Sequence, residues 1–167
     1  MSSQAKATLQ EIRDAVEIEL STFLSKQASF LDSISSDLAP VSQALSSFLL
    51  DSGKRLRPLF AYSGYISGGG VVSTPVIKAI ASLELLQACA LIHDDLIDGS
   101  DTRRGKPSIH RHFESIHVQE ELEGFAPAYG LAAAVLLGVR ETYGNRCRRS
   151  ACRRPRSWSC SPAAAAA

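Results

Sequence analysis

The chain has 167 residues, 45% of them hydrophobic and 21% charged, which is ordinary for a soluble globular protein with one domain. Its formal net charge of +1 excludes a protein that is strongly basic or acidic overall. The charge is unevenly spread, because residues 139–167 hold seven of the 18 Lys and Arg residues and one of the 17 acids. No secretory signal is visible and no run approaches the roughly 20 apolar residues of a membrane span, so we expect a cytoplasmic protein without a transmembrane segment.

Apolar residues recur at helical spacing through most of the chain. The first stripe predicts a helix from Ala7 to about Ser35, and the second predicts a shorter helix from Pro40 to about Gly53. Pro58 fits the first turn of a third helix, where its missing N–H costs nothing. After three glycines, Thr74-Pro75 has the features of an N-cap and a proline in the first helical turn.

The longest apolar stripe predicts a central, buried helix from Thr74 to about Asp98, because it is apolar nearly all round. We expect a polar loop over Gly99–Ser108, then short helices over Arg111–Gln119 and Pro127–Gly138. No segment alternates apolar and polar residues, so we predict no strands and an all-α fold class.

The composition changes after Gly138. Residues 139–167 are rich in Arg, Cys and Ala, lack apolar periodicity and end in five alanines. We therefore predict one domain over residues 1–138 and a tail over 139–167 that is disordered or translated in a shifted frame.

Three carboxylates stand at the end of the predicted central helix. Asp94 and Asp98 are four residues apart, so they share a helix face, whereas Asp95 is rotated by about 100°. Negative charge at a helix C-terminus opposes the macrodipole, so ligand binding explains these acids better than helix stability does. Such oxygen ligands suit Mg²⁺, which also binds substrate phosphates. The alternative is a solvated last turn.

Two basic groups accompany the acids. Arg103 and Arg104 follow in the polar loop, and guanidinium groups suit bidentate phosphate contact. Lys54 and Arg57 stand at a loop-to-helix junction, where a helix N-terminus attracts anions. Taken singly, each group also fits a surface pair or a basic helix start. Taken together, they predict a site for two phosphate groups beside a metal.

The segments GKRLRP and LLQACALIHDDLIDGSDTRRGKP, and more weakly GLAAAVLLG, resemble the polyprenyl synthetase family, the trans-isoprenyl diphosphate synthases. The resemblance covers roughly residues 10–138. It implies an all-α isoprenoid synthase helical bundle, of which this chain would form the N-terminal half only. It also implies a homodimer in the intact family.

The resemblance further implies an enzyme that condenses isopentenyl diphosphate with an allylic diphosphate. In that family the first aspartate-rich motif binds the Mg²⁺ that chelates the allylic diphosphate. This implies Asp94 and Asp98 as metal ligands, Asp95 as a contributor, and Arg103 as a contact of the allylic diphosphate.

For isopentenyl diphosphate, the resemblance implies contacts from Lys54, Arg57, Gln87 and Arg104, with Gly53 as a further candidate. The prenyl chain would grow along the face of the central helix that precedes the acids, which is formed by Leu86, Cys89 and Ala90. Cys89 and Ala90 are small, where family members that stop at fifteen carbons commonly carry an aromatic residue. We therefore expect a geranylgeranyl or longer product.

The chain also departs from the family pattern. A second aspartate-rich motif and a downstream Lys are absent, since no Asp follows Asp101 and no Lys follows Lys106. We therefore expect little or no condensation by this chain alone. Of the histidines, we expect His93 to be structural, and the histidines at 110, 112 and 117 to lie on the surface.

Three other interpretations remain. A terpene cyclase shares an aspartate-rich motif but ionises a single substrate, so dependence on isopentenyl diphosphate would distinguish it. A non-catalytic partner subunit would co-purify with an intact synthase. Nucleic-acid binding through the Arg-rich tail is disfavoured, because aromatic residues such as Trp158 are few in the tail. We therefore expect no nucleic-acid partner.

Overall fold

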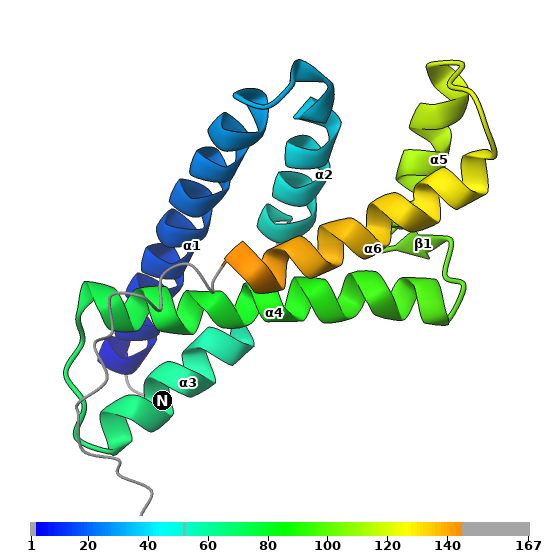
Figure 1. Cartoon of the computed structure of the whole chain (residues 1–167). Coiled ribbons are helices and arrows are strands. Elements are labelled where there is room, and N and C mark those ends of the chain that lie inside the picture. The colour runs from blue at the N-terminus through cyan, green and yellow to red at the C-terminus, as the bar shows by residue number, and fades with distance from the viewer. Residues whose placement is uncertain (1–2, 52, 145–167) are drawn as a thin grey trace, which may run out of the picture.

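The computed structural model describes residues 3–51 and 53–144, and Figure 1 shows that most of them are helical. The all-α fold class is therefore confirmed. In chain order, the elements are α1 (Ser3–Asp32), the 3₁₀-helix η1 (Ser36–Leu38), α2 (Ala39–Leu50), α3 (Leu56–Ser67), α4 (Thr74–Ile97), β1 (Thr102–Arg103), β2 (Lys106–Pro107), α5 (Ile109–Gln119) and α6 (Ala126–Gly144).

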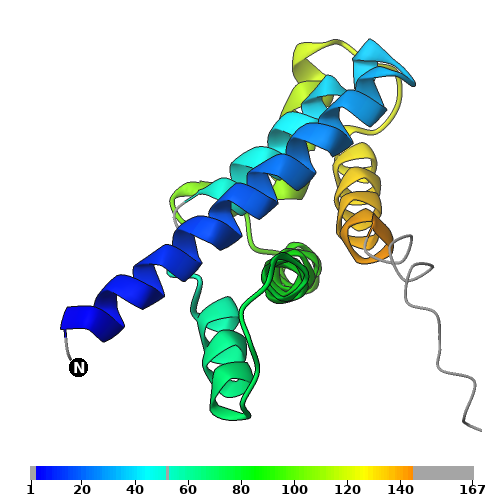
Figure 2. The ribbon, with the colours of Figure 1, turned by 90° about the vertical axis from the view of Figure 1, so that its left-hand side faces the viewer.

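Helix α4 lies at the centre, as predicted. Helices α1, α3 and α6 all pack against it, and α5 packs on α6 (Figures 1 and 2). The core joins residues from all six α-helices, among which Val16, Leu45, Ile92 and Phe113 are almost completely buried. Burial of these apolar side chains is the main source of stability of the bundle.

Local sequence signals account for most helix starts. Pro40 lies in the first turn of α2, and Ser73, in extended conformation, is the N-cap of α4. The N-cap of α4 is therefore one residue earlier than predicted, which moves Pro75 to the second helical position.

The prediction of no strands is wrong at one place. The two-residue strands β1 and β2 pair antiparallel, and they are joined by Arg104 and Gly105. Both joining residues have positive φ, 53° and 77°, as in the tight hairpin turns that match the twist of paired strands. The strands are too short for an alternating pattern to reveal them in the sequence.

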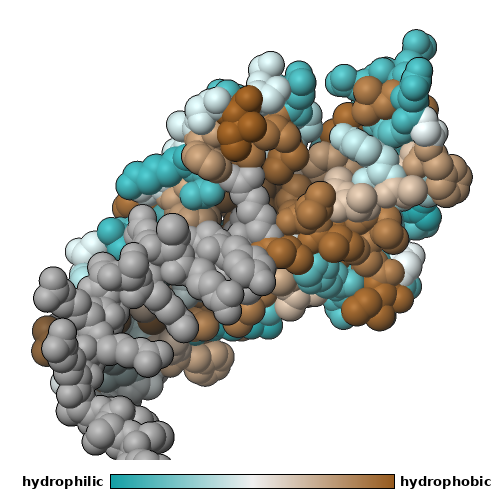
Figure 3. Space-filling view, viewed as in Figure 1, coloured by the Kyte–Doolittle hydropathy of each residue, from teal (hydrophilic) through white to brown (hydrophobic). Residues whose placement is uncertain are grey.

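The expectation that α4 is buried all round holds for only part of its surface. Leu86 and Ile97 on α4 are 56% and 83% exposed, and Leu131 and Leu136 on α6 are also exposed. Hydrophobic residues accordingly gather over α6 and the C-terminal half of α4 in Figure 3. By length and composition, α4 would also suffice to cross a membrane, contrary to our expectation that no run approaches that length. Its contacts with four other helices, α1, α2, α3 and α6, are those of a core helix.

Helix α6 continues to Gly144, so it includes the first six residues of the segment that we assigned to a tail. The rest of that segment, residues 145–167, lies outside the described residues. The division of the chain at residue 138 stays a prediction.

The prediction that His117 lies on the surface is wrong. Its side chain is buried, 5% exposed, against the ring of Tyr129 at a centroid distance of 5.2 Å. Its Nε2 donates to the carbonyl oxygen of Glu123 at 3.3 Å. The partner comes from the loop after α5, which periodicity within the helix does not reveal.

Glycines set the spacing between α6 and its neighbours. A Cβ atom at Gly130 would lie 2.3 Å from the backbone oxygen of His110 on α5. A Cβ atom at Gly138 would lie 2.5 Å from Nε2 of His93 on α4. Gly130 therefore permits a close approach of α5 that any larger residue would disturb, whereas a larger residue at Gly138 would displace the His93 ring.

We predict that Gly130→Ala lowers the free energy of unfolding by about 1–3 kcal/mol, because the added methyl group meets a backbone atom that cannot rotate away. The matched control is Gly64→Ala in α3, where a Cβ atom would meet nothing within 4 Å. That substitution should raise stability by about 0.5–1 kcal/mol through helix propensity. Urea unfolding followed by circular dichroism measures both, and equal effects of the two substitutions would contradict the packing argument.

Candidate functional site

The C-terminal end of α4 separates the three acids of the predicted metal motif. Asp94 and Asp98 are exposed on one side of the helix, whereas Asp95 is 2% exposed. Within the described residues, the Asp94 and Asp98 side chains have no hydrogen-bond or ion-pair partner, so both are free to bind a ligand. The structure thus brings Asp94 and Asp98 together and turns Asp95 inward.

Asp95 holds Arg103 in a bidentate ion pair. Nε and Nη2 of Arg103 donate to the two carboxylate oxygens at 2.7 and 2.6 Å. The hydrogen bonds to Asp95 raise the pKa of Arg103 above its ordinary value, and the charges of Asp94 and Asp98 act in the same direction. Arg103 therefore lies within electrostatic reach of all three acids. Asp95 is an anchor for Arg103, and its contribution to metal binding stays a prediction.

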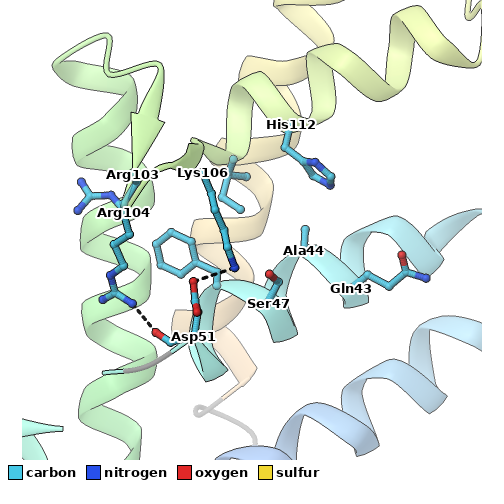
Figure 4. A pocket seen from close by; sticks show the side chains of 10 residues that line it. Gln43, Ala44, Ser47, Asp51, Arg103, Arg104, Lys106 and His112 are labelled. Carbon is cyan, nitrogen blue, oxygen red and sulfur yellow. Dashed lines mark hydrogen bonds and ion pairs between the residues drawn. The ribbon is translucent and has the colours of Figure 1, made fainter. Parts of the chain in front are cut away.

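The β1–β2 hairpin also docks on the end of α2. Nη1 of Arg104 donates to the backbone oxygen of Asp51 at 2.6 Å, and Nζ of Lys106 donates to the Asp51 carboxylate at 2.9 Å (Figure 4). Asp51 lies three residues before Lys54. The fold thereby joins the loop that carries the Arg pair to the segment that carries the first basic group.

Sequence reasoning missed the roles of Asp51 and Lys106, because their pairing spans 55 residues and leaves no local pattern. Both line a hollow of about 220 Å³ between α2, the hairpin and α5. Figure 4 shows Gln43, Ser47 and His112 around the same hollow.

Lys54 and Arg57 are exposed at the start of α3, as a ligand contact requires. Arg55 between them is buried, and it donates hydrogen bonds to Glu17, Glu84 and the backbone oxygen of Leu49. The role of Arg55 could not be predicted from the sequence, where it is one cation in a basic run. Its partners lie on three other helices. Gly53 precedes this segment and is half-buried.

Gln87 lies two helical turns before Asp94, so the two residues share a face of α4. Gln87 is half-buried. The three residues assigned to the chain-length pocket differ in surroundings, since Leu86 and Ala90 are exposed and Cys89 is half-buried. The Cys89 sulfur lies 3.7 Å from Nδ1 of His93. The pocket assignment stays a prediction.

His93 connects α4 to α6 beside the acids. Its Nε2 donates to the backbone oxygen of Val135 at 3.4 Å, and the ring packs on Gly138. His93 is therefore occupied by contacts between helices.

The described side chains offer a divalent cation two carboxylates at the end of α4. Within the described residues, no three His, Cys, Asp or Glu side chains gather closely enough to hold a metal ion by themselves. Mg²⁺ does not need such a cage, because it keeps several waters and commonly binds one or two carboxylates together with substrate phosphates. The exposed, unpaired Asp94 and Asp98 fit that mode of binding.

Comparisons with known proteins place this arrangement in a family. The family model for polyprenyl synthetase matches residues 39–138. A farnesyl diphosphate synthase from Haemophilus influenzae is 34% identical over 66% of this chain and 38% of its own length. The geranylgeranyl pyrophosphate synthase 11 of Arabidopsis thaliana chloroplasts is 39% identical over 44% of this chain and 21% of its own length.

The fold agrees with these matches. The crystal structure of a geranylgeranyl pyrophosphate synthase from Corynebacterium glutamicum, complexed with isoprenyl diphosphate and magnesium, superimposes with a TM-score of 0.76 at 36% identity. The alignment covers 85% of this chain and 42% of that protein, so the chain spans less than half the length of the relatives it matches. With the family model matching 100 residues of the 167, the chain belongs to the polyprenyl synthetase family.

Proposed function

We propose that the chain supplies the first diphosphate-binding half of a trans-prenyltransferase, which joins isopentenyl diphosphate to an allylic diphosphate. The observation that carries the proposal is the placement of two free carboxylates, Asp94 and Asp98, within electrostatic reach of Arg103 at the end of an apolar helix. Such a site favours a ligand that bears phosphates at one end and hydrocarbon at the other.

Asp94 and Asp98 would hold Mg²⁺, with Arg103 directed to the allylic diphosphate. When bound, Mg²⁺ neutralises charge on the leaving diphosphate and so assists ionisation of the allylic C–O bond. Guanidinium groups stabilise the same developing charge. Exposed apolar residues of α4, such as Leu86 and Ile97, would shield the allylic cation from water.

Lys54 and Arg57 would bind the diphosphate of isopentenyl diphosphate together with Gln87, Arg104 and Gly53. Both cations lie at the N-terminal end of α3, where helical N–H groups and the helix dipole also favour an anion. Arg104 is exposed and approaches this segment through its hydrogen bond to Asp51. The double bond of isopentenyl diphosphate would then attack the allylic cation, and the cation so formed would lose a proton to give the longer allylic diphosphate. No protein nucleophile is required.

We further propose a cytoplasmic, homodimeric protein with a product of geranylgeranyl length or longer. The small residues Cys89 and Ala90 support the product length, because they leave room beside α4. Exposed apolar side chains of α6, including Leu131 and Leu136, support association with another subunit.

The alternative of a partner subunit has support of its own. One relative, 37% identical over 46% of this chain, is named heptaprenyl diphosphate synthase component 2, from Geobacillus stearothermophilus. Since the 167 residues hold a single aspartate-rich motif, we propose that condensation by this chain alone is weak or absent. Incubation of the purified chain with both diphosphates and Mg²⁺ tests this, and rapid turnover would contradict it.

We predict that Asp94→Asn and Asp98→Asn each weaken Mg²⁺-dependent binding of inorganic pyrophosphate by about tenfold or more, because each removes one charged oxygen ligand. Isothermal titration calorimetry with and without MgCl₂ measures the effect. Asp101→Asn is the control, because Asp101 is exposed and paired with Arg111. The metal site is wrong if the control loses as much Mg²⁺-dependent affinity as the two variants.

We predict that Lys54→Gln and Arg57→Gln each weaken binding of isopentenyl diphosphate by about tenfold or more, since a charge-assisted hydrogen bond contributes about 1.5–3 kcal/mol. Titration calorimetry without Mg²⁺ measures the contribution of these two cations to binding separately from that of the metal. Lys78→Gln on α4, which pairs loosely with Glu19, should leave the affinity unchanged. Unaltered affinity in both Lys54 and Arg57 variants would rule out this segment as the site.

We predict that Cys89→Phe shortens the products of a condensing assembly that contains this chain, because the ring fills about one helical turn, 5.4 Å, of the proposed path. Chromatography of the dephosphorylated products measures their length. Cys89→Ser preserves the size of the side chain and should leave product length unchanged. An identical product spectrum in the Phe variant would reject the pocket assignment.

A further inference from the structure

Arg55 is a buried cation that joins three helices to the segment between α2 and α3. Its side chain is 5% exposed. Nε donates to Glu17 on α1 at 3.0 Å, Nη1 donates to Glu84 on α4 at 2.9 Å, and Nη2 donates to the backbone oxygen of Leu49 on α2 at 2.7 Å. Each nitrogen of the guanidinium group therefore contacts a different helix.

The backbone at Arg55 is as unusual as its side chain. Its φ and ψ of 49° and 37° lie in the left-handed region, which non-glycine residues seldom adopt and which persists where surrounding contacts hold it. Arg55 is also the N-cap of α3 without a capping hydrogen bond from its side chain. The three contacts of its guanidinium group thus fix the point at which α3 begins.

The basic side chains of this segment lie in different surroundings. Arg55 turns into the protein, whereas Lys54 and Arg57 stay exposed. Burial lowers the pKa of Arg55, but the hydrogen bonds that Arg55 donates to Glu17 and Glu84 outweigh that effect, and the pKa is raised overall. Arg55 therefore remains charged, and its charge pairs with the two carboxylates of Glu17 and Glu84.

We propose that Arg55, Glu17 and Glu84 are positioning residues, which hold Lys54 and Arg57 in place for the diphosphate of isopentenyl diphosphate. The proposal rests on the function proposed above. Glu84 lies three residues before Gln87 on α4, about 4.5 Å along the helix axis. The contact between Arg55 and Glu84 therefore fixes the basic segment beside another residue proposed to bind the same substrate.

Glu84→Gln is the principal test, because the amide oxygen can still accept a hydrogen bond while the carboxylate charge is lost. We expect binding of isopentenyl diphosphate, measured by calorimetry, to weaken by about tenfold. Glu19→Gln is the matched control, since Glu19 also bridges α1 and α4, through a 3.9 Å pair with Lys78, but does not touch Arg55. Equal affinity in the Glu84 variant and the control would overturn the proposal.

A double-mutant cycle distinguishes positioning from general destabilisation. If Glu84 acts through the two cations, Glu84→Gln should have little further effect in a chain that already carries Lys54→Gln and Arg57→Gln. Additive losses would overturn the proposal. Absence of isopentenyl diphosphate binding by the unmodified chain would instead reject the proposed function.

Limited proteolysis tests, without a ligand, whether Glu84 holds the basic segment in place. Glu84→Gln should speed trypsin cleavage after Lys54 and Arg55 by about tenfold relative to cleavage elsewhere, because the local segment opens more often. Uniform acceleration at all sites would overturn the proposal. Should Glu84→Gln fail to fold, Glu17→Gln decides the matter by the same two measurements, since Glu17 is 46% exposed and less costly to change.

Discussion

The ion pair between Asp95 and Arg103 is the contact on which the rest of the candidate site depends. A carboxylate at the C-terminal end of a helix opposes the helix dipole, and a buried one is costly unless it is paired. The two hydrogen bonds from Arg103 satisfy both oxygens of Asp95. Because Arg103 pairs with Asp95, the hairpin is fixed against the end of α4. Asp94 and Asp98 are not used in this pair, so their carboxylates remain free.

The same division of labour recurs in the other basic segment. Arg55 is buried and holds its segment against α1, α2 and α4, while Lys54 and Arg57 remain exposed. In both places, one charged side chain is paired within the protein while its neighbours are exposed: Asp95 beside Asp94 and Asp98, and Arg55 beside Lys54 and Arg57. Arginine suits this role, because its planar fork offers donors to several acceptors at once and does not lose its charge.

The sequence predicted the helices well, because most carry several turns of apolar residues and several begin or end beside Pro or Gly. Helical geometry also predicted that Asp95 turns away from Asp94 and Asp98. Contacts between distant segments were not predictable, including those of Arg55 with Glu17 and Glu84 and the burial of His117. Such contacts depend on the packing of helices, which periodicity within one helix does not encode.

Helix α4 shows why composition alone misjudged burial. Its residues are apolar nearly all round, yet Leu86 and Ile97 are exposed while Ile92 is buried. A core helix, a membrane span and the wall of a hydrocarbon-binding cavity all need this composition, so hydropathy cannot separate them. Under the proposed function the acids distinguish them, since Asp94 and Asp98 lie at the end of the helix on its exposed side. A membrane span gains no stability from two unpaired carboxylates at that position. A cavity for a prenyl diphosphate, in contrast, needs a hydrocarbon wall that is followed along the same helix by metal ligands.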